Sequence, residues 1–190
     1  VGSYLVPVLA KLVHPDRIIC VDGDKLEKKN LDRQLFDEND IGKNKAYALA
    51  GKYGTRFTEQ WFDVGWAGLE RKTILFVCVD NHIARRAALD TCDTVGCTAI
   101  IAANESYSAE AYIYFRKFKD TPADPRVYYP EILTDRSGDP RAAAIGCTGH
   151  AQVESPQLSP ANAMAAALAI HLSQMWFAGR TMKKETLPHI

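Results

Sequence analysis

The spacing of apolar side chains alternates between a helical period and short continuous runs, which predicts alternating helices and strands. Residues 2–13 carry apolar side chains at helical spacing, and Pro15 ends the predicted helix. Residues 42–52 and 81–92 have the composition of two further helices. A last helix is expected to begin at Ser159, because a serine followed by a proline is a typical helix start.

The apolar runs between these helices predict strands. Residues 18–21, 73–79 and 98–102 are continuous apolar runs, as expected for strands buried in a parallel sheet. Residues 110–118 instead alternate between apolar and polar side chains, which indicates a more exposed, antiparallel strand. The sequence therefore predicts an α/β fold, with a Rossmann-like, mostly parallel sheet, helices on both faces and an antiparallel extension.

The segment before the last helix has a different character. Six prolines lie between residues 119 and 160 and break any long element. We interpret residues 119–158 as a long crossover segment, and connections of that length in a compact domain are often functional. The length of 190 residues suits a single domain over residues 1–190.

Composition and charge exclude several classes of protein. Hydrophobic residues make up 47% of the chain and charged residues 24%, which is typical of a globular protein and not of a disordered one. The 23 basic residues balance 23 acidic ones, so the chain has no bulk attraction for nucleic acid or for an anionic membrane. No apolar stretch approaches the roughly 20 residues of a membrane span. Any anionic ligand must be held by a local arrangement of charges.

The five cysteines indicate a reducing compartment. Their number is odd, and none forms the Cys-x-x-Cys pair that is typical of structural zinc, so we expect no structural zinc. The N-terminal residues lack the pattern of a secretion signal, and a cytoplasmic location is expected. The sequence starts at Val1-Gly2-Ser3 without methionine, and we interpret it as a fragment that lacks its true beginning.

Acidic side chains follow two of the predicted strands directly. Asp22 and Asp24 come after residues 18–21, and Asp80-Asn81 comes after residues 73–79. Ligands of open parallel sheets bind at the carboxyl ends of the strands, where an aspartate suits a ribose hydroxyl or a phosphate-bound metal. The alternative is that each acidic residue caps the next helix or shapes a turn.

Basic and small residues lie beside the same predicted edge. Arg33 and Lys45 have the charge to neutralise a polyphosphate, although a solvated loop and an exposed helix would use the same residue types. Gly2 and Ser3 open the first helix, and N–H groups at a helix start bind phosphate readily.

Three motifs follow one another along the chain with suitable gaps. Residues 21–34 read VDGDKLEKKNLDRQ, residues 41–46 read IGKNKA, and residues 79–81 read VDN and precede an Arg-Arg pair. Together they resemble the motifs of the ThiF and ubiquitin-activating-enzyme superfamily. The resemblance covers residues 2–105 well and the helix from Ser159 more loosely. The region 142–176 is most similar to the ThiF-like proteins of the bacterial PRTRC gene cluster.

The resemblance implies ATP-dependent adenylation of the C-terminal carboxylate of a small ubiquitin-like or sulfur-carrier protein. ATP and Mg²⁺ are the implied cofactors, and a homodimer is the implied assembly. Asp22 is expected to hold the ribose, and Asp80 the metal ion. Phosphate contacts are expected from Asn30, Arg33 and Lys45. The nucleotide site is completed by Gly2 and Ser3, as the end of a largely missing glycine loop, and by Asp24, Gln34 and Asn81.

Cys147 is the candidate nucleophile for a transfer step after adenylation. It lies in the long crossover segment, three residues before His150, which would favour the thiolate. The alternative is a small residue at a turn between two glycines.

The sequence features also suit two functions other than adenylation. One is a nucleotide-binding module without transfer chemistry, acting through an oligomeric interface. The other is a redox enzyme with a dinucleotide cofactor, which the polar segment after Asp22 does not favour.

Overall fold

The computed structural model describes residues 1–63, 66, 68–104, 107–136 and 159–180. Its helices, 3₁₀ helices (η) and strands follow in chain order. They are α1 (Gly2–Leu12), η1 (Pro15–Arg17), β1 (Ile19–Val21), η2 (Lys28–Asn30), η3 (Glu38–Asp40), α2 (Lys45–Tyr53), β2 (Arg56–Thr58), β3 (Ile74–Val77), α3 (His82–Val95), β4 (Thr98–Asn104), β5 (Ala109–Phe115), η4 (Arg116–Phe118), α4 (Pro125–Tyr128), α5 (Glu131–Thr134) and α6 (Ser159–Phe177).

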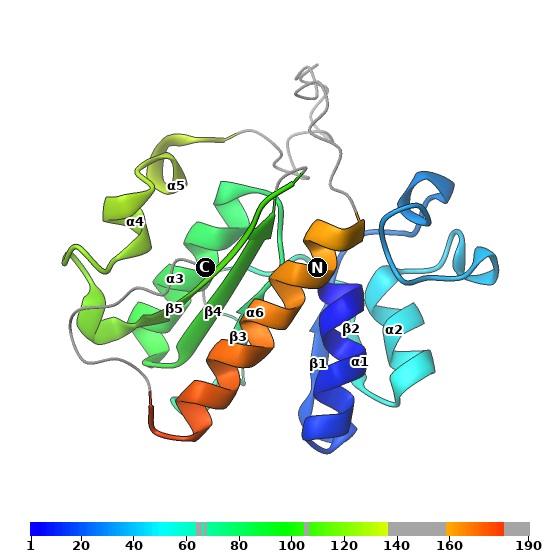
Figure 1. Ribbon diagram of the computed structural model, residues 1–190, viewed down its shortest axis with the longest axis horizontal. Coiled ribbons are helices and arrows are strands. Elements are labelled where there is room, and N and C mark those ends of the chain that lie inside the picture. The colour runs from blue at the N-terminus through cyan, green and yellow to red at the C-terminus, as the bar shows by residue number, and fades with distance from the viewer. Residues whose placement is uncertain (64–65, 67, 105–106, 137–158, 181–190) are drawn as a thin grey trace.

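The strands form two hydrogen-bonded groups. β1 pairs in parallel with β2, and β3 pairs in parallel with β4, while β5 lies antiparallel to β4. This mixed arrangement, with helices packed on it, confirms the predicted fold class (Figure 1). The sequence analysis did not anticipate β2, which is only three residues long and has exposed or half-buried side chains.

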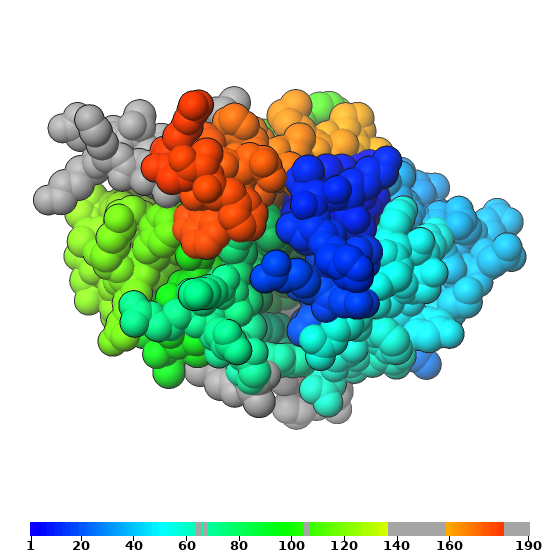
Figure 2. Space-filling model, turned by 90° about the horizontal axis from the view of Figure 1, so that it is seen from below, coloured from blue at the N-terminus to red at the C-terminus, as the bar shows by residue number. Residues whose placement is uncertain are grey.

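Alternate residues of β4 face two separate hydrophobic clusters, so the sheet has helices on both faces. Ile100 and Ala102 pack against α1 and α6, whereas Ala99 and Ile101 pack against α3. α1 lies between α6 and α2 on its face (Figures 1 and 2).

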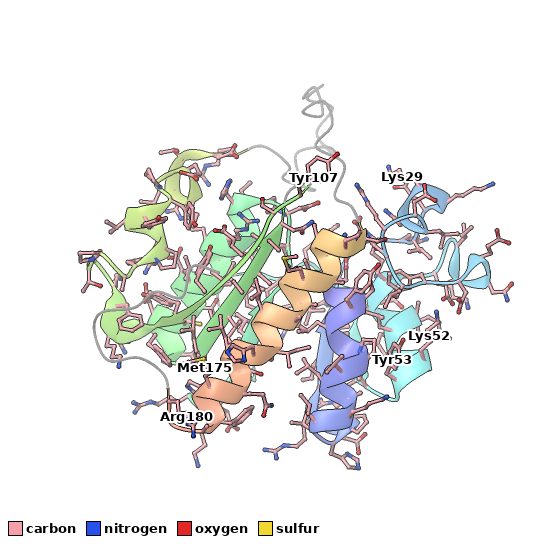
Figure 3. The ribbon with its side chains drawn as sticks, viewed as in Figure 1. Lys29, Lys52, Tyr53, Tyr107, Met175 and Arg180 are labelled. Carbon is pink, nitrogen blue, oxygen red and sulfur yellow. The ribbon has the colours of Figure 1, made fainter. Side chains whose placement is uncertain are left out.

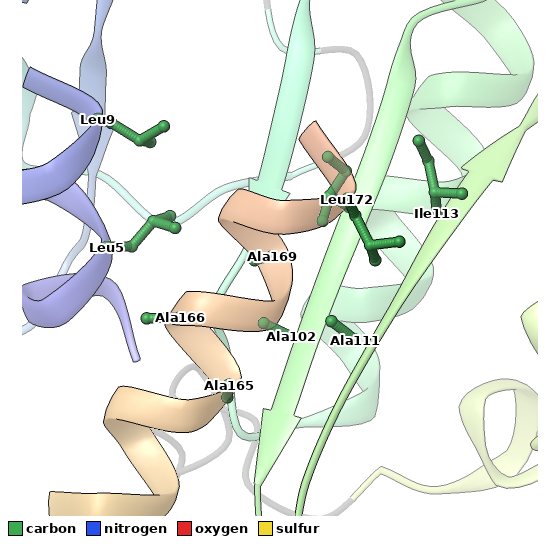
Figure 4. Packing of buried hydrophobic residues seen from close by; sticks show 10 residues of the cluster. Leu5, Leu9, Ala102, Ala111, Ile113, Ala165, Ala166, Ala169 and Leu172 are labelled. Carbon is green, nitrogen blue, oxygen red and sulfur yellow. The ribbon is translucent and has the colours of Figure 1, made fainter. Parts of the chain in front are cut away.

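Small side chains let α6 lie close to the sheet and to α1. Ala165, Ala166 and Ala169 are almost fully buried and face β4, β5 and the leucines of α1 (Figure 4). This packing fixes the start of α6 next to the start of α1, where the candidate site lies.

Element boundaries differ from the predicted ones where a local cap decides them. α2 begins at Lys45 rather than at residue 42, because the Asn44 side chain accepts the N–H of Tyr47 and Gly42 takes a positive φ of 83°. β5 ends at Phe115, since the next three residues turn into η4. The part of the crossover segment that the structure describes contains α4 and α5.

Candidate nucleotide site

The starts of α1 and α6 lie together at one end of the molecule (Figure 1). The Asn162 side chain of α6 joins them, because its Oδ1 accepts a hydrogen bond of 2.8 Å from the Val1 nitrogen. Its Nδ2 donates to the carbonyl of Arg33, and the Ser159 hydroxyl donates to the carbonyl of Asp32. α6 therefore anchors both the first helix and the loop that carries Arg33.

Arg33, Lys45 and Asp80 gather around the start of α1 from three separate segments. The pKa of the Val1 amino group is lowered, chiefly because the group is buried. The charge of Asp80 raises the pKa of this amino group, while the charges of Arg33 and Lys45 lower it further. All three side chains are therefore close enough to act on the same amino group, as the sequence motifs led us to expect.

Asp22 and Asp24 lie at the same edge of the sheet. The pKa of Asp22 is raised, mainly by burial, and the hydrogen bond from the Asp24 N–H partly offsets this. Lys45 also lowers the pKa of Asp22 and Asp80 raises it. Lys45 Nζ pairs with Asp24 Oδ2 at 2.8 Å. The end of β1 thus holds a half-buried carboxylate next to a positioned lysine.

Asn44 shapes this strand end, and the sequence analysis did not single it out. While its Oδ1 caps α2, its Nδ2 donates to the carbonyls of Asp22 and Asp24, at 2.7 and 3.0 Å. Its position just before an alanine-rich helix is a typical N-cap signal that would have identified it.

Asp80 and Asn81 are adjacent, but their side chains do different things. Asn81 Oδ1 accepts the N–H of Ala84 at 2.8 Å and caps α3, which is the alternative role considered for this pair. Within the described residues, the exposed Asp80 carboxylate has neither a hydrogen bond nor an ion pair. It is therefore open to a ligand.

The remaining predicted residues divide between backbone and side-chain roles. Gly2 and Ser3 lie in the first turn of α1, where N–H groups have no acceptor within the helix. The Ser3 hydroxyl accepts the N–H of Leu35. The buried Asn30 has its Oδ1 bonded to the Glu27 N–H in a capping box, and Gln34 is half-buried in the same loop.

Two aromatic residues at the site were missed by the sequence analysis. Trp61 is 42% exposed and packs against Gly23, where an added β-carbon would lie only 2.5 Å from the indole ring. Tyr107 is 90% exposed and projects at the same end of the molecule as the starts of α1 and α6 (Figure 3). No local sequence pattern identifies either of them.

The described residues contain no cluster of three or more histidine, cysteine, aspartate or glutamate side chains that would hold an ion. A single open carboxylate such as Asp80 nevertheless suits Mg²⁺ carried in by phosphates, because this ion keeps several waters and takes few protein ligands.

Cys147 lies outside the described residues. Of the helices in the described ranges, none is both long and apolar enough to cross a bilayer.

Comparison with solved structures identifies the fold. The chain is similar to PaaA, with a TM-score of 0.62 and 17% identity over 96% of the chain. It is also similar to E. coli MccB bound to AMPCPP and MccA, with a TM-score of 0.65 and 18% identity over 95% of the chain. A third match is E. coli MccB with ATP, at a TM-score of 0.64 and 18% identity over 95% of the chain.

These matches extend over only part of the known proteins. The chain spans 62% of the length of PaaA and 53–54% of MccB. No protein-family model and no curated protein matches the sequence. The chain thus shares the fold of PaaA and MccB, which confirms the predicted Rossmann-like fold class.

Proposed function

We propose that the protein adenylates the C-terminal carboxylate of a peptide or a small carrier protein, using ATP. The observation that carries this proposal is the gathering of Arg33, Lys45 and Asp80 around the start of α1. The likeness to MccB, solved with ATP and with MccA, supports the same type of substrate pair.

The charges at the site match the parts of ATP. Asp22, beside the end of β1, accepts hydrogen bonds from the ribose hydroxyls. Arg33 and Lys45 neutralise the phosphates, together with the N–H groups of Gly2 and Ser3 in the first turn of α1. Arg33 suits this role because its buried Nε has no hydrogen-bond partner in the part of the chain that the structure describes.

Asp80 would hold Mg²⁺ bound to the phosphates, and the ion would offset the charge that develops on the leaving pyrophosphate. The absence of an internal partner for the Asp80 carboxylate within the described ranges supports this assignment. Asn81 serves next to it by holding the start of α3, which keeps the Asp80 backbone in place.

The reaction joins two anions. The substrate carboxylate attacks the α-phosphorus of ATP, an O–P bond to AMP forms, and pyrophosphate leaves. No general base is needed, because the carboxylate is already ionised at neutral pH. Positioning and electrostatic stabilisation by Arg33 and Lys45 are therefore the main contributions of the protein to the rate.

Further parts of the proposal concern partners. A small ubiquitin-like or sulfur-carrier protein is the proposed substrate, and the highly exposed Tyr107 is the proposed contact for its C-terminal tail. A homodimer is the proposed assembly. Transfer of the acyl group to Cys147 would follow adenylation.

ATP–pyrophosphate exchange tests the adenylation step. The full-length protein is assayed with a panel of purified sulfur-carrier proteins and synthetic peptides that end in a free carboxylate. We expect exchange with at least one member, and a loss of roughly 10²–10³-fold in Asp80→Ala. Asp16→Ala is the matched control, because it removes an exposed carboxylate from η1, near the opposite end of α1.

Two outcomes contradict the proposal. Unchanged exchange in Asp80→Ala would remove the metal assignment. ATP binding by titration calorimetry without exchange for any member of the panel would instead favour the nucleotide-binding module.

A further inference from the structure

Two buried thiols meet where α3 ends. The Sγ atoms of Cys92 and Cys97 lie 3.0 Å apart, and the two residues are 0% and 1% exposed. Gly96 between them takes a left-handed conformation with φ of 80°, and its N–H donates to the Cys92 carbonyl at 2.8 Å. This glycine turn reverses the chain and returns Cys97 onto the last turn of the helix.

The position of this pair explains why the sulfurs touch. In helices that end in a left-handed glycine, the residue after the glycine packs on the residue five positions earlier in the chain, usually through apolar side chains. Here cysteines occupy both positions. Their sulfurs are only about 1 Å farther apart than in a disulfide.

The other two described cysteines have different surroundings. Cys20 Sγ contacts the Thr55 hydroxyl at 3.4 Å, and Cys78 lies next to Gly2. Burial raises the pKa of Cys78 to about 11. Neither is within hydrogen-bond distance of another thiol in the described part of the chain, so they serve as internal controls.

We propose that Cys92 and Cys97 are a reversible redox modification site, which forms an intramolecular disulfide with small thiol oxidants. The hydrogen bond from Cys92 lowers the pKa of Cys97, and this favours Cys97 as the attacking thiolate. With diamide, the Cys97 sulfur adds to the N=N bond. The Cys92 sulfur then displaces the hydrazine nitrogen, and both thiol protons end on the hydrazine.

The bond would join the end of α3 to the start of β4. The opposite ends of these two elements carry Asn81 and Asn104, at the edge of the sheet where the candidate site lies. Because the sulfurs already touch, the oxidised protein should keep its fold, and the bond should raise the midpoint of thermal unfolding by restricting the unfolded chain.

Peptide mapping tests the proposal directly. The folded full-length protein is treated with diamide, then denatured in an alkylating reagent and digested with trypsin. Peptide 87–116 contains Cys92 and Cys97 and no other cysteine. We expect it to be unalkylated and two hydrogens lighter, and dithiothreitol should restore two alkylated sites. Peptides 18–25 and 73–85, with Cys20 and Cys78, should stay alkylated.

Three results would overturn the proposal. The first is full alkylation of peptide 87–116 after diamide. The second is a cross-link from it to peptide 142–180, which contains Cys147. The third is a disulfide that forms only after urea has unfolded the protein. Cys92→Ser should abolish the light peptide, and the wild-type measurement remains decisive if that variant does not fold.

Discussion

Arg33 and Arg126 are both at least half-buried, but they differ in whether their guanidinium groups have partners within the protein. Arg126 is 8% exposed and donates to Asp90, Asp93 and Asp124 at 2.8–3.0 Å and to the Tyr114 hydroxyl. Arg33 is half-buried, and within the described residues it has no ion pair and an unpartnered Nε. A guanidinium with complete internal pairing supports the fold, whereas one without pairing is available to an anion.

The locations of the two arginines agree with this distinction. Arg126 lies on α4 and connects it to the last turns of α3 and to β5. Arg33 lies in the loop held by Asn162 beside the start of α1. The fold thus separates a charged network that stabilises it from a group of charges that we assign to ATP.

The largest expected effect is on stability at the paired arginine. Arg126→Met should lower the free energy of unfolding by about 3–5 kcal/mol, because it leaves Asp124 buried without its cation and Asp93 with only Lys119, at 3.4 Å. Urea denaturation measures this change, and ATP affinity of the folded fraction should stay at the wild-type value. A loss below 1 kcal/mol would mean that the network contributes little to the fold.

The unpaired arginine should show the reverse pattern. Arg33→Ala should weaken ATP binding roughly tenfold to a hundredfold, as expected for the loss of hydrogen bonds to a charged group. Its unfolding free energy should change by no more than about 1 kcal/mol, since no internal ion pair is broken. Titration calorimetry with ATP and urea denaturation together measure both. Unchanged ATP affinity with a large loss of stability would reverse the assignment of Arg33.

The smallest expected effect concerns Asp22 and depends on pH. Burial raises its pKa above the ordinary value of 3.8, so ionised Asp22 costs stability in the folded protein. Asp22→Asn should therefore raise the free energy of unfolding at pH 7. The gain should shrink as pH falls through the raised pKa. It should disappear below about pH 3.8, where Asp22 is protonated in both the folded and the unfolded protein. An equal gain at pH 4 and pH 7 would contradict the burial of this carboxylate.

Local pattern predicted most of the fold, but it identified only some of the residues that the structure brings together at the candidate site. The helical spacing of apolar side chains and the continuous apolar runs located the helices and most strands. A helix or strand that buries one face needs apolar side chains at such positions. The pattern placed Asp80 and Asn81 at a strand end, but it left open which of them caps α3. That depended on the backbone turn, which directs the Asn81 side chain to the Ala84 N–H.

Long-range contacts were out of reach of the sequence analysis. Asn162 is one polar residue in an alanine-rich helix, and its partners lie 129 and 161 positions earlier in the chain. Trp61 was missed for the same reason, because its contact with Gly23 depends on how two strand ends meet. Residues of this kind have no local period that reveals them.

The Asn162 bridge also has a consequence for protein synthesis. A ribosome releases the loop around Arg33 before it makes α6, so the hydrogen bonds from Ser159 and Asn162 to this loop form only later. The loop that carries Arg33 gains its contacts with α6 only when Asn162 emerges. A nascent chain that stalls before this codon would carry the motif residues that we assign to ATP, but not the hydrogen bonds from α6 that position their loop.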